Sequence, residues 1–195
     1  MSDQIALAER QQDALARLRA IPESERYHEI LRGRLVDKPR PSLAHGFTQG
    51  KLGALLAAPG WWLGLECEFQ LGGEVFYVQP DVSGIRKERM PVLTDETPCL
   101  VRPDWIGEVV SPSHEARDKV LKRRGYAAAG VPNLWLVCLR TRTLTALTLR
   151  GVHYEVERVA HAGERVRLPP FESVELFVEY LFLPIEEGMG TKEPS

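Results

Sequence analysis

The sequence lacks several features that would place it in a special class of protein. No uncharged stretch reaches the roughly 18 residues of a membrane-spanning helix, and there is no internal repeat or low-complexity tract. The N-terminus carries charges throughout, unlike the apolar core of a secretory signal peptide. These absences predict a cytoplasmic protein without a membrane partner.

Cysteines are few, and neither sign of charge dominates. Cys67, Cys99 and Cys138 are widely spaced and form no CxxC pair, which favours reduced core thiols over a disulfide framework. The formal net charge is only −2, so the chain is not a generally basic nucleic-acid-binding protein. Any contact with phosphate groups must therefore come from a local patch.

The length and composition favour a single core. A chain of 195 residues with 44% hydrophobic residues can bury one substantial core. We expect a helical extension over residues 1–22, one domain over 23–185 and a disordered polar tail over 186–195, where "EEGMGTKEPS" has few apolar residues.

The order of predicted elements defines the fold class. After an N-terminal helix, "YHEILRGRLVDKP" predicts a β-hairpin that turns at Gly33, and "HGFTQGKLGALLAA" predicts a second helix. Three strands follow in "GLECEFQL", "EVFYVQPDV" and "DWIGEVVS", the first two paired through Gly72–Gly73. The segment "SPSHEARDKVLKRRGYAAAGV" predicts a third helix with Gly130 at its end, before a strand in "NLWLVC". This order predicts an α/β fold with a mixed sheet flanked by helices.

Two acids stand inside apolar strand-like runs. Asp81 follows Pro80, and Glu108 shares a strand face with Ile106. Either acid could simply end or cap a strand, but a carboxylate in an apolar run is costly unless it is paired. Two carboxylates that meet at one end of a sheet suit Mg²⁺ or Mn²⁺, which keep water ligands for a phosphate substrate. Asp104, in a second Pro-Asp pair, lies about 13 Å from Glu108 along the same strand and is too far to share a metal.

The third helix carries further candidates. Asp118, Lys122 and Tyr126 fall in one row at spacings of four residues. Lys122 could instead form an ordinary surface ion pair with Asp118, and Tyr126 could simply pack in the core. The basic residues of this helix are typical of a solvated face, but beside a metal site for a phosphate substrate they would bind phosphates: Arg117, Lys119 and Arg123.

Two secondary candidates lie elsewhere. Glu68 could add a ligand or a water contact, although a solvated sheet face is the simpler interpretation of its strand. His45 stands at a helix start, where a histidine commonly acts as a cap or hydrogen-bond partner. Glu29 in "YHEI" is similarly ambiguous, and no role is assigned to it.

Taken in order, these segments resemble the Uma family of restriction-endonuclease-like proteins, within the PD-(D/E)xK nuclease superfamily. The resemblance covers roughly residues 27–178 and is carried by "YHEILRGRLV", "PSLAH", "VQPDV", "EVVSPS", the Asp118/Lys122/Tyr126 helix, "AAAGVPNLWLV" and "GVHYEV". It implies a restriction-endonuclease-like αβββαβ core and a divalent-metal site that cleaves DNA. Asp81 matches the motif aspartate, and Glu108 matches the second acid.

One position departs from the superfamily pattern. The usual lysine, two residues after the second acid, is replaced by Val110, and the resemblance shifts its role to Lys122 on the helix. We therefore expect Asp81, Glu108 and the Val109 carbonyl to hold Mg²⁺ or Mn²⁺ while Lys122 orients the attacking water. Two alternatives are a catalytically inactive binding module and a hydrolase for another phosphoester. A homodimer would suit cleavage of both strands of a duplex.

Overall fold

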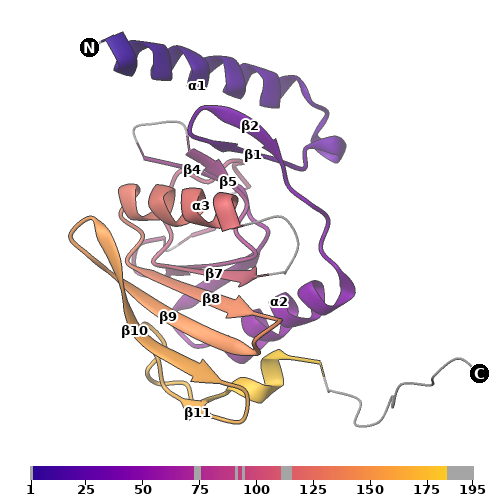
Figure 1. Ribbon diagram of the computed structural model, residues 1–195, viewed down its shortest axis with the longest axis vertical. Helices are drawn as coiled ribbons and strands as arrows, with labels where there is room; N and C mark the ends of the chain where they lie inside the picture. Colours follow the sequence, from indigo (N-terminus) through magenta and orange to yellow (C-terminus); the bar gives the residue numbers. More distant parts are fainter. Residues whose placement is uncertain (1, 73–75, 91, 94, 111–115, 184–195) are drawn as a thin grey trace, which may run out of the picture.

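The computed structural model describes residues 2–72, 76–90, 92–93, 95–110 and 116–183 (Figure 1). Three α-helices are present in this part of the chain: α1 (Ser2–Ala20), α2 (Leu43–Leu55) and α3 (Ala116–Ala128). Two short 3-10 helices, η1 and η2, span Glu23–Glu25 and Val178–Leu181. None of the described helices is both long and apolar enough to cross a membrane.

The strands form two main sheets and a small third one. The four-stranded sheet has the order β2-β1-β5-β4. The six-stranded sheet has the order β10-β9-β8-β7-β6-β3, and β11 pairs with β12. The strand bounds are β1 (His28–Leu31), β2 (Arg34–Asp37), β3 (Trp61–Leu65), β4 (Phe69–Leu71), β5 (Phe76–Val78), β6 (Val82–Arg86), β7 (Trp105–Val110), β8 (Asn133–Cys138), β9 (Thr143–Arg150), β10 (His153–His161), β11 (Arg165–Val166) and β12 (Leu176–Phe177).

The six-stranded sheet is mixed, as the sequence predicts. Strands β7 and β8 run parallel and are joined through α3, whereas the other neighbouring pairs run antiparallel. Side chains alternate along β7, so Trp105 and Ile106 face opposite sides of the sheet. Trp105 belongs to the core that includes Leu52 of α2, and Ile106 belongs to the core that includes Tyr126 of α3. The helices therefore cover opposite faces (Figure 1), and the order α2-β3-β6-β7-α3-β8 is the predicted αβββαβ core.

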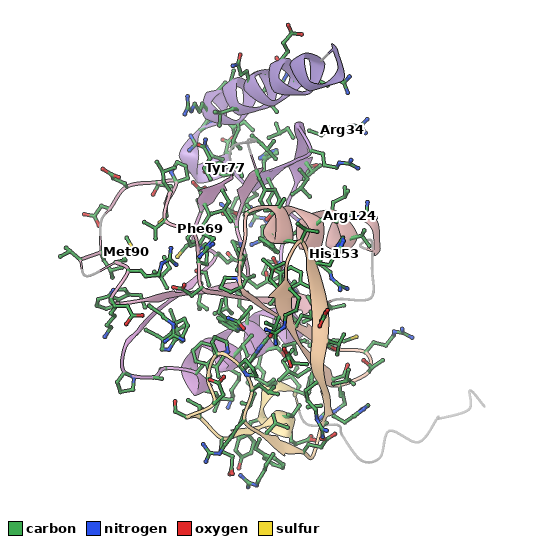
Figure 2. All side chains as sticks on the ribbon, turned by 90° about the vertical axis from the view of Figure 1, so that its left-hand side faces the viewer. Arg34, Phe69, Tyr77, Met90, Arg124 and His153 are labelled. Carbon is green, nitrogen blue, oxygen red and sulfur yellow. The ribbon has the colours of Figure 1, made fainter. Side chains whose placement is uncertain are left out.

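The N-terminal hairpin and α1 form a separate layer. Arg32 and Gly33 both have positive φ values, 52° and 70°, as a tight two-residue turn requires. Helix α1 buries Ala14 and Leu18 against Ile30 of β1 and Tyr77 of β5. Figure 2 shows Tyr77 beneath α1. The helical extension therefore packs on the four-stranded sheet.

Two of the predicted strands are each broken in the middle. The run 64–71 splits into β3 and β4 around Glu66, which has a φ of 52°, and the run 74–82 splits into β5 and β6. Pro80 contributes to the second break because proline cannot donate a ladder hydrogen bond. The breaks lie opposite each other, since the N–H of Glu66 donates to the Asp81 carbonyl at 3.3 Å. The hairpin thus passes from one sheet to the other, with Asp81 at the bend.

Other expectations had mixed outcomes. The antiparallel pairing of β4 with β5 and the positive φ of Gly130 (74°) agree with the sequence. Cys67, expected in the core, is exposed at the strand break, because it lies outside the paired residues. The tail predicted over 186–195 and the helix start predicted over 111–113 lie outside the described residues.

Candidate active site

Asp81 and Glu108 lie at the same end of adjacent strands. Val82 of β6 pairs with Gly107 of β7, so the residues that flank this pair, Asp81 and Glu108, are neighbours across the two strands. The backbone N–H of Val109 donates to Asp81 Oδ2 at 2.7 Å. Both acids line a cavity of about 110 Å³.

Asp81 is 4% exposed and is surrounded by donors. His45 Nε2 of α2 lies 3.1 Å from Oδ2, and Lys38 Nζ lies 3.9 Å from Oδ1. Gln49 of α2 donates to the Asp81 carbonyl at 2.9 Å and fixes the backbone.

The contacts of Asp81 shift two pKa values. Burial alone would raise the pKa of Asp81, but the hydrogen bond and charge of His45, helped by Lys122 and Lys38, hold it below the ordinary value. Burial alone would lower the pKa of His45, but Asp81 outweighs it and raises that pKa. The pair therefore favours a carboxylate beside an imidazolium.

Glu108 is held by two residues of α3. Lys122 Nζ lies 2.8 Å from Glu108 Oε1, and the Tyr126 hydroxyl donates to the same oxygen at 2.5 Å. Lys122 and Tyr126 are four residues apart and therefore lie on one side of the helix. Together they account for two of the three positions in the row predicted from the sequence.

Burial and neighbouring charges act on Glu108 and Lys122 in opposite directions. Burial raises the pKa of Glu108, assisted by the negative charges of Asp81 and Glu29, although Lys122 opposes the shift. Burial would lower the pKa of Lys122, but Glu108, Glu29 and Asp81 raise it well above the usual value for lysine. The lysine therefore carries its charge throughout the physiological range.

Three residues of the site had no role assigned from the sequence. Glu29 Oε1 accepts the backbone N–H of Gln79 at 2.9 Å and lies 3.1 Å from Lys122 Nζ. Lys38 Nζ donates to the Gln79 carbonyl at 2.9 Å and lies 3.5 Å from Glu66 Oε1. All three side chains line the cavity: Glu29, Lys38 and Glu66.

The remaining candidates divide between the cavity and other places. Glu68 is absent from the described lining of the cavity, because its carboxylate accepts Tyr77 and the Gln79 side chain instead. Arg123 lines the cavity and donates to the Tyr154 carbonyl at 3.0 Å. Asp104 accepts the N–H of Arg86 and an N–H of the Arg89 guanidinium, which gives it a structural role away from Asp81. The side chains of Arg117, Asp118 and Lys119 lie outside the part of the chain that the structure describes.

A mixed sheet between helices, with two acids at the paired ends of adjacent strands, defines a nuclease-like protein. The family described as "Putative restriction endonuclease" (Uma2) matches residues 14–179, and the chain belongs to this family. This result confirms the resemblance found in the sequence.

A solved structure agrees with the fold. The chain is similar to the crystal structure of "a putative nuclease belonging to DUF820 from Anabaena variabilis ATCC 29413", with a TM-score of 0.70 and 22% sequence identity. The match covers 86% of this chain and 96% of that chain. At this identity the likeness shows the fold alone. No curated protein matches the chain.

Proposed function

We propose that this chain is a divalent-metal-dependent endonuclease that hydrolyses phosphodiester bonds in DNA. Membership of a restriction-endonuclease family supports nuclease-like chemistry. One observation carries the finer assignment: Lys122 Nζ of α3 lies 2.8 Å from Glu108, in the cavity that Asp81 also lines. A charged lysine beside two carboxylates is therefore present, although Val110 stands at the usual lysine position.

The donor set fits a hard divalent cation. Mg²⁺ binds proteins through one or two carboxylates and completes its shell with water and phosphate oxygens. Asp81 Oδ1 lies 3.9 Å from Lys38 Nζ, which is beyond hydrogen-bonding distance. Lys38 therefore does not occupy a lone pair of Oδ1, and this oxygen can bind a cation. Within the described residues no three His, Cys, Asp or Glu side chains group around a metal position. Two carboxylates and one backbone carbonyl would then form the protein's share of the shell.

The carbonyl we propose is that of Val109. Its N–H points to Asp81, and the N–H and C=O of one strand residue point to the same side of the strand. The Val109 carbonyl is therefore on the side of β7 that faces Asp81. When bound, Mg²⁺ or Mn²⁺ supplies Lewis acidity that polarises a phosphate oxygen and lowers the pKa of water.

The residues of the chain would orient the reacting groups. The Lys122 ammonium has three N–H donors, and Glu108 and Glu29 occupy two of them. The third would hold the attacking water or a phosphate oxygen and offset the negative charge that develops there. Arg123, exposed at the cavity, would bind a neighbouring phosphate together with Arg117 and Lys119.

A catalytically inactive binding module is the second candidate. Val110 lines the cavity with Leu134 and Leu136, so this part of its wall is apolar where a lysine would ordinarily reach the water. Such a protein would bind metal and nucleic acid without cleavage.

The two Pro-Asp pairs offer a matched test of metal binding. Calorimetric titration with Mn²⁺ should show that Asp81→Asn weakens binding more than about tenfold, since a ligand is lost. Asp104→Asn, the same change at a structural aspartate that is also buried, should leave the affinity unchanged. Equal affinity of the Asp81→Asn variant and wild type would contradict the proposed site.

The same proteins should then be tested on supercoiled plasmid with Mn²⁺. We expect cleavage by wild type and none by Asp81→Asn. Metal binding by wild type without cleavage of any DNA or RNA would favour the inactive module.

A further inference from the structure

Glu29 is a buried acid of the site with no assigned role. It lies on β1 in the four-stranded sheet, is 5% exposed, and lines the cavity. A buried carboxylate is costly unless donors satisfy it. Its Oε1 atom has two donors, the backbone N–H of Gln79 at 2.9 Å and Lys122 Nζ at 3.1 Å.

The two donors belong to two different parts of the site. Gln79 precedes Asp81 by two residues and begins the bend that carries it between the sheets. Lys122 belongs to α3 and lies 2.8 Å from Glu108. A single oxygen of Glu29 therefore connects the Asp81 bend with the ammonium that contacts Glu108.

We propose that Glu29 is a positioning residue, which holds the Lys122 ammonium against Glu108 and at a fixed position relative to the Asp81 bend. The role in catalysis rests on the proposed nuclease function. A lysine side chain has four rotatable bonds, and one contact leaves its end free to swing. A second charge-assisted bond from a different layer of the fold fixes the ammonium at one point.

The contacts of Oε1 support this role over metal binding through that oxygen. A carboxylate oxygen has two lone pairs, and Gln79 and Lys122 occupy both lone pairs of Oε1. Glu29→Gln keeps an oxygen that can accept the Gln79 N–H but removes the charge that attracts Lys122. The variant therefore separates the two contacts of Glu29.

The test is a double-substitution cycle with Lys122→Gln, measured on plasmid cleavage with Mn²⁺. Glu29→Gln alone should lower kcat about 10- to 100-fold, the usual cost of losing a residue that orients a reacting group. KM and the calorimetric Mn²⁺ affinity should stay near wild type. In the Lys122→Gln background the same change should lower kcat less than about twofold, because the residue through which Glu29 acts is already lost.

Two results would overturn the proposal. An equal loss of kcat in both backgrounds would mean that Glu29 acts through Gln79 alone. A loss of Mn²⁺ affinity as large as that of Asp81→Asn would make Glu29 a metal ligand. Glu68→Gln is the matched control, because Glu68 contacts the Gln79 side chain but not Lys122, and it should leave kcat unchanged.

A second measurement does not depend on activity. Thermal unfolding should be measured in EDTA for wild type, Glu29→Gln, Lys122→Gln and the double variant. The decrease in Tm of the double variant should be smaller than the sum of the decreases in the two single variants. Additive shifts would overturn the Glu29–Lys122 coupling. If wild type cleaves no nucleic acid, the proposed function fails, whereas this cycle still decides whether Glu29 holds Lys122.

Discussion

Replacing Lys122 with methionine removes the positive charge that lies beside Glu108 and Glu29 and keeps most of the side-chain stem. The Lys122 side chain is 14% exposed, with Glu108 at 2.8 Å and Glu29 at 3.1 Å. The variant leaves these two buried carboxylates without their ammonium. Because burial already raises the pKa of Glu108, we expect this residue to take up a proton in the variant.

The loss of stability follows from the ion pairs that the variant removes. Removing one partner of a buried ion pair costs about 3–5 kcal/mol, and protonation of Glu108 recovers part of that. In a chain of this size each kcal/mol lowers Tm by about 2–4 °C, so we expect a decrease of roughly 5–15 °C. The difference in Tm between wild type and the variant should grow with pH. The reason is that a buried carboxyl with a raised pKa destabilises the folded protein as pH rises through that pKa and the group ionises.

The assay is single-turnover cleavage of plasmid DNA with Mn²⁺, well below the Tm of the variant. Lys122→Met should slow the chemical step by about 10² or more, as expected for a positioned catalytic group. Lys51→Met is the control: this exposed lysine on α2 lies over the Phe47 ring, 5.3 Å from its centroid, and is not among the described cavity residues. Cleavage by Lys122→Met at the wild-type rate would refute the relocated-lysine mechanism.

Two further predictions concern pH and packing. The pKa of His45 is raised from 6.5, so its stabilisation is complete below pH 6.5 and is lost as pH rises through the folded pKa. In EDTA the Tm advantage of wild type over His45→Gln should therefore shrink as pH rises above 6.5, and a constant difference would contradict this. Gly125→Ala should destabilise by about 1–3 kcal/mol in urea unfolding, because its Cβ would lie 2.4 Å from the Phe76 ring. Gly46→Ala, also helical but with no such neighbour within 4 Å, should stabilise by up to about 1 kcal/mol, and equal effects would refute the packing argument.

The order of helices and strands could be read from the sequence because it depends on local periodicity. The hairpin turn at Gly33 and the helix end at Gly130 also had local signals, since both positions need positive φ. The breaks in the two long strands were missed. Pro80 was an available signal for one break, but nothing in the sequence indicates that Glu66 would adopt a left-handed conformation.

The site was partly predictable for the same reason. Asp81 and Glu108 stood out as acids in apolar runs, and helical spacing placed Lys122 and Tyr126 together. Their catalytic and metal-binding roles stay predictions. Glu29 carries the same sequence signal as Asp81, an acid among apolar strand residues, so its place in the site was also predictable.

Lys38 and Glu66 could not be found from the sequence. They reach the cavity through a loop after β2 and through the bend between the sheets. Their proximity depends on how the two sheets meet, which no local pattern encodes.

The position of the Lys122 ammonium depends on the packing of a helix, whereas the position of a lysine on β7 would depend on the pairing of that strand. Residue 110 is two positions after Glu108 and shares its face, so a lysine there would be fixed by the register of β7 alone. Lys122 instead depends on how α3 packs against both sheets. Gly125 lets α3 lie close to β5 of the four-stranded sheet, because a Cβ at this position would lie 2.4 Å from the Phe76 ring, whose centroid is 5.4 Å from that of Tyr126. Substitutions that lift α3 should therefore slow the reaction even where they touch neither acid.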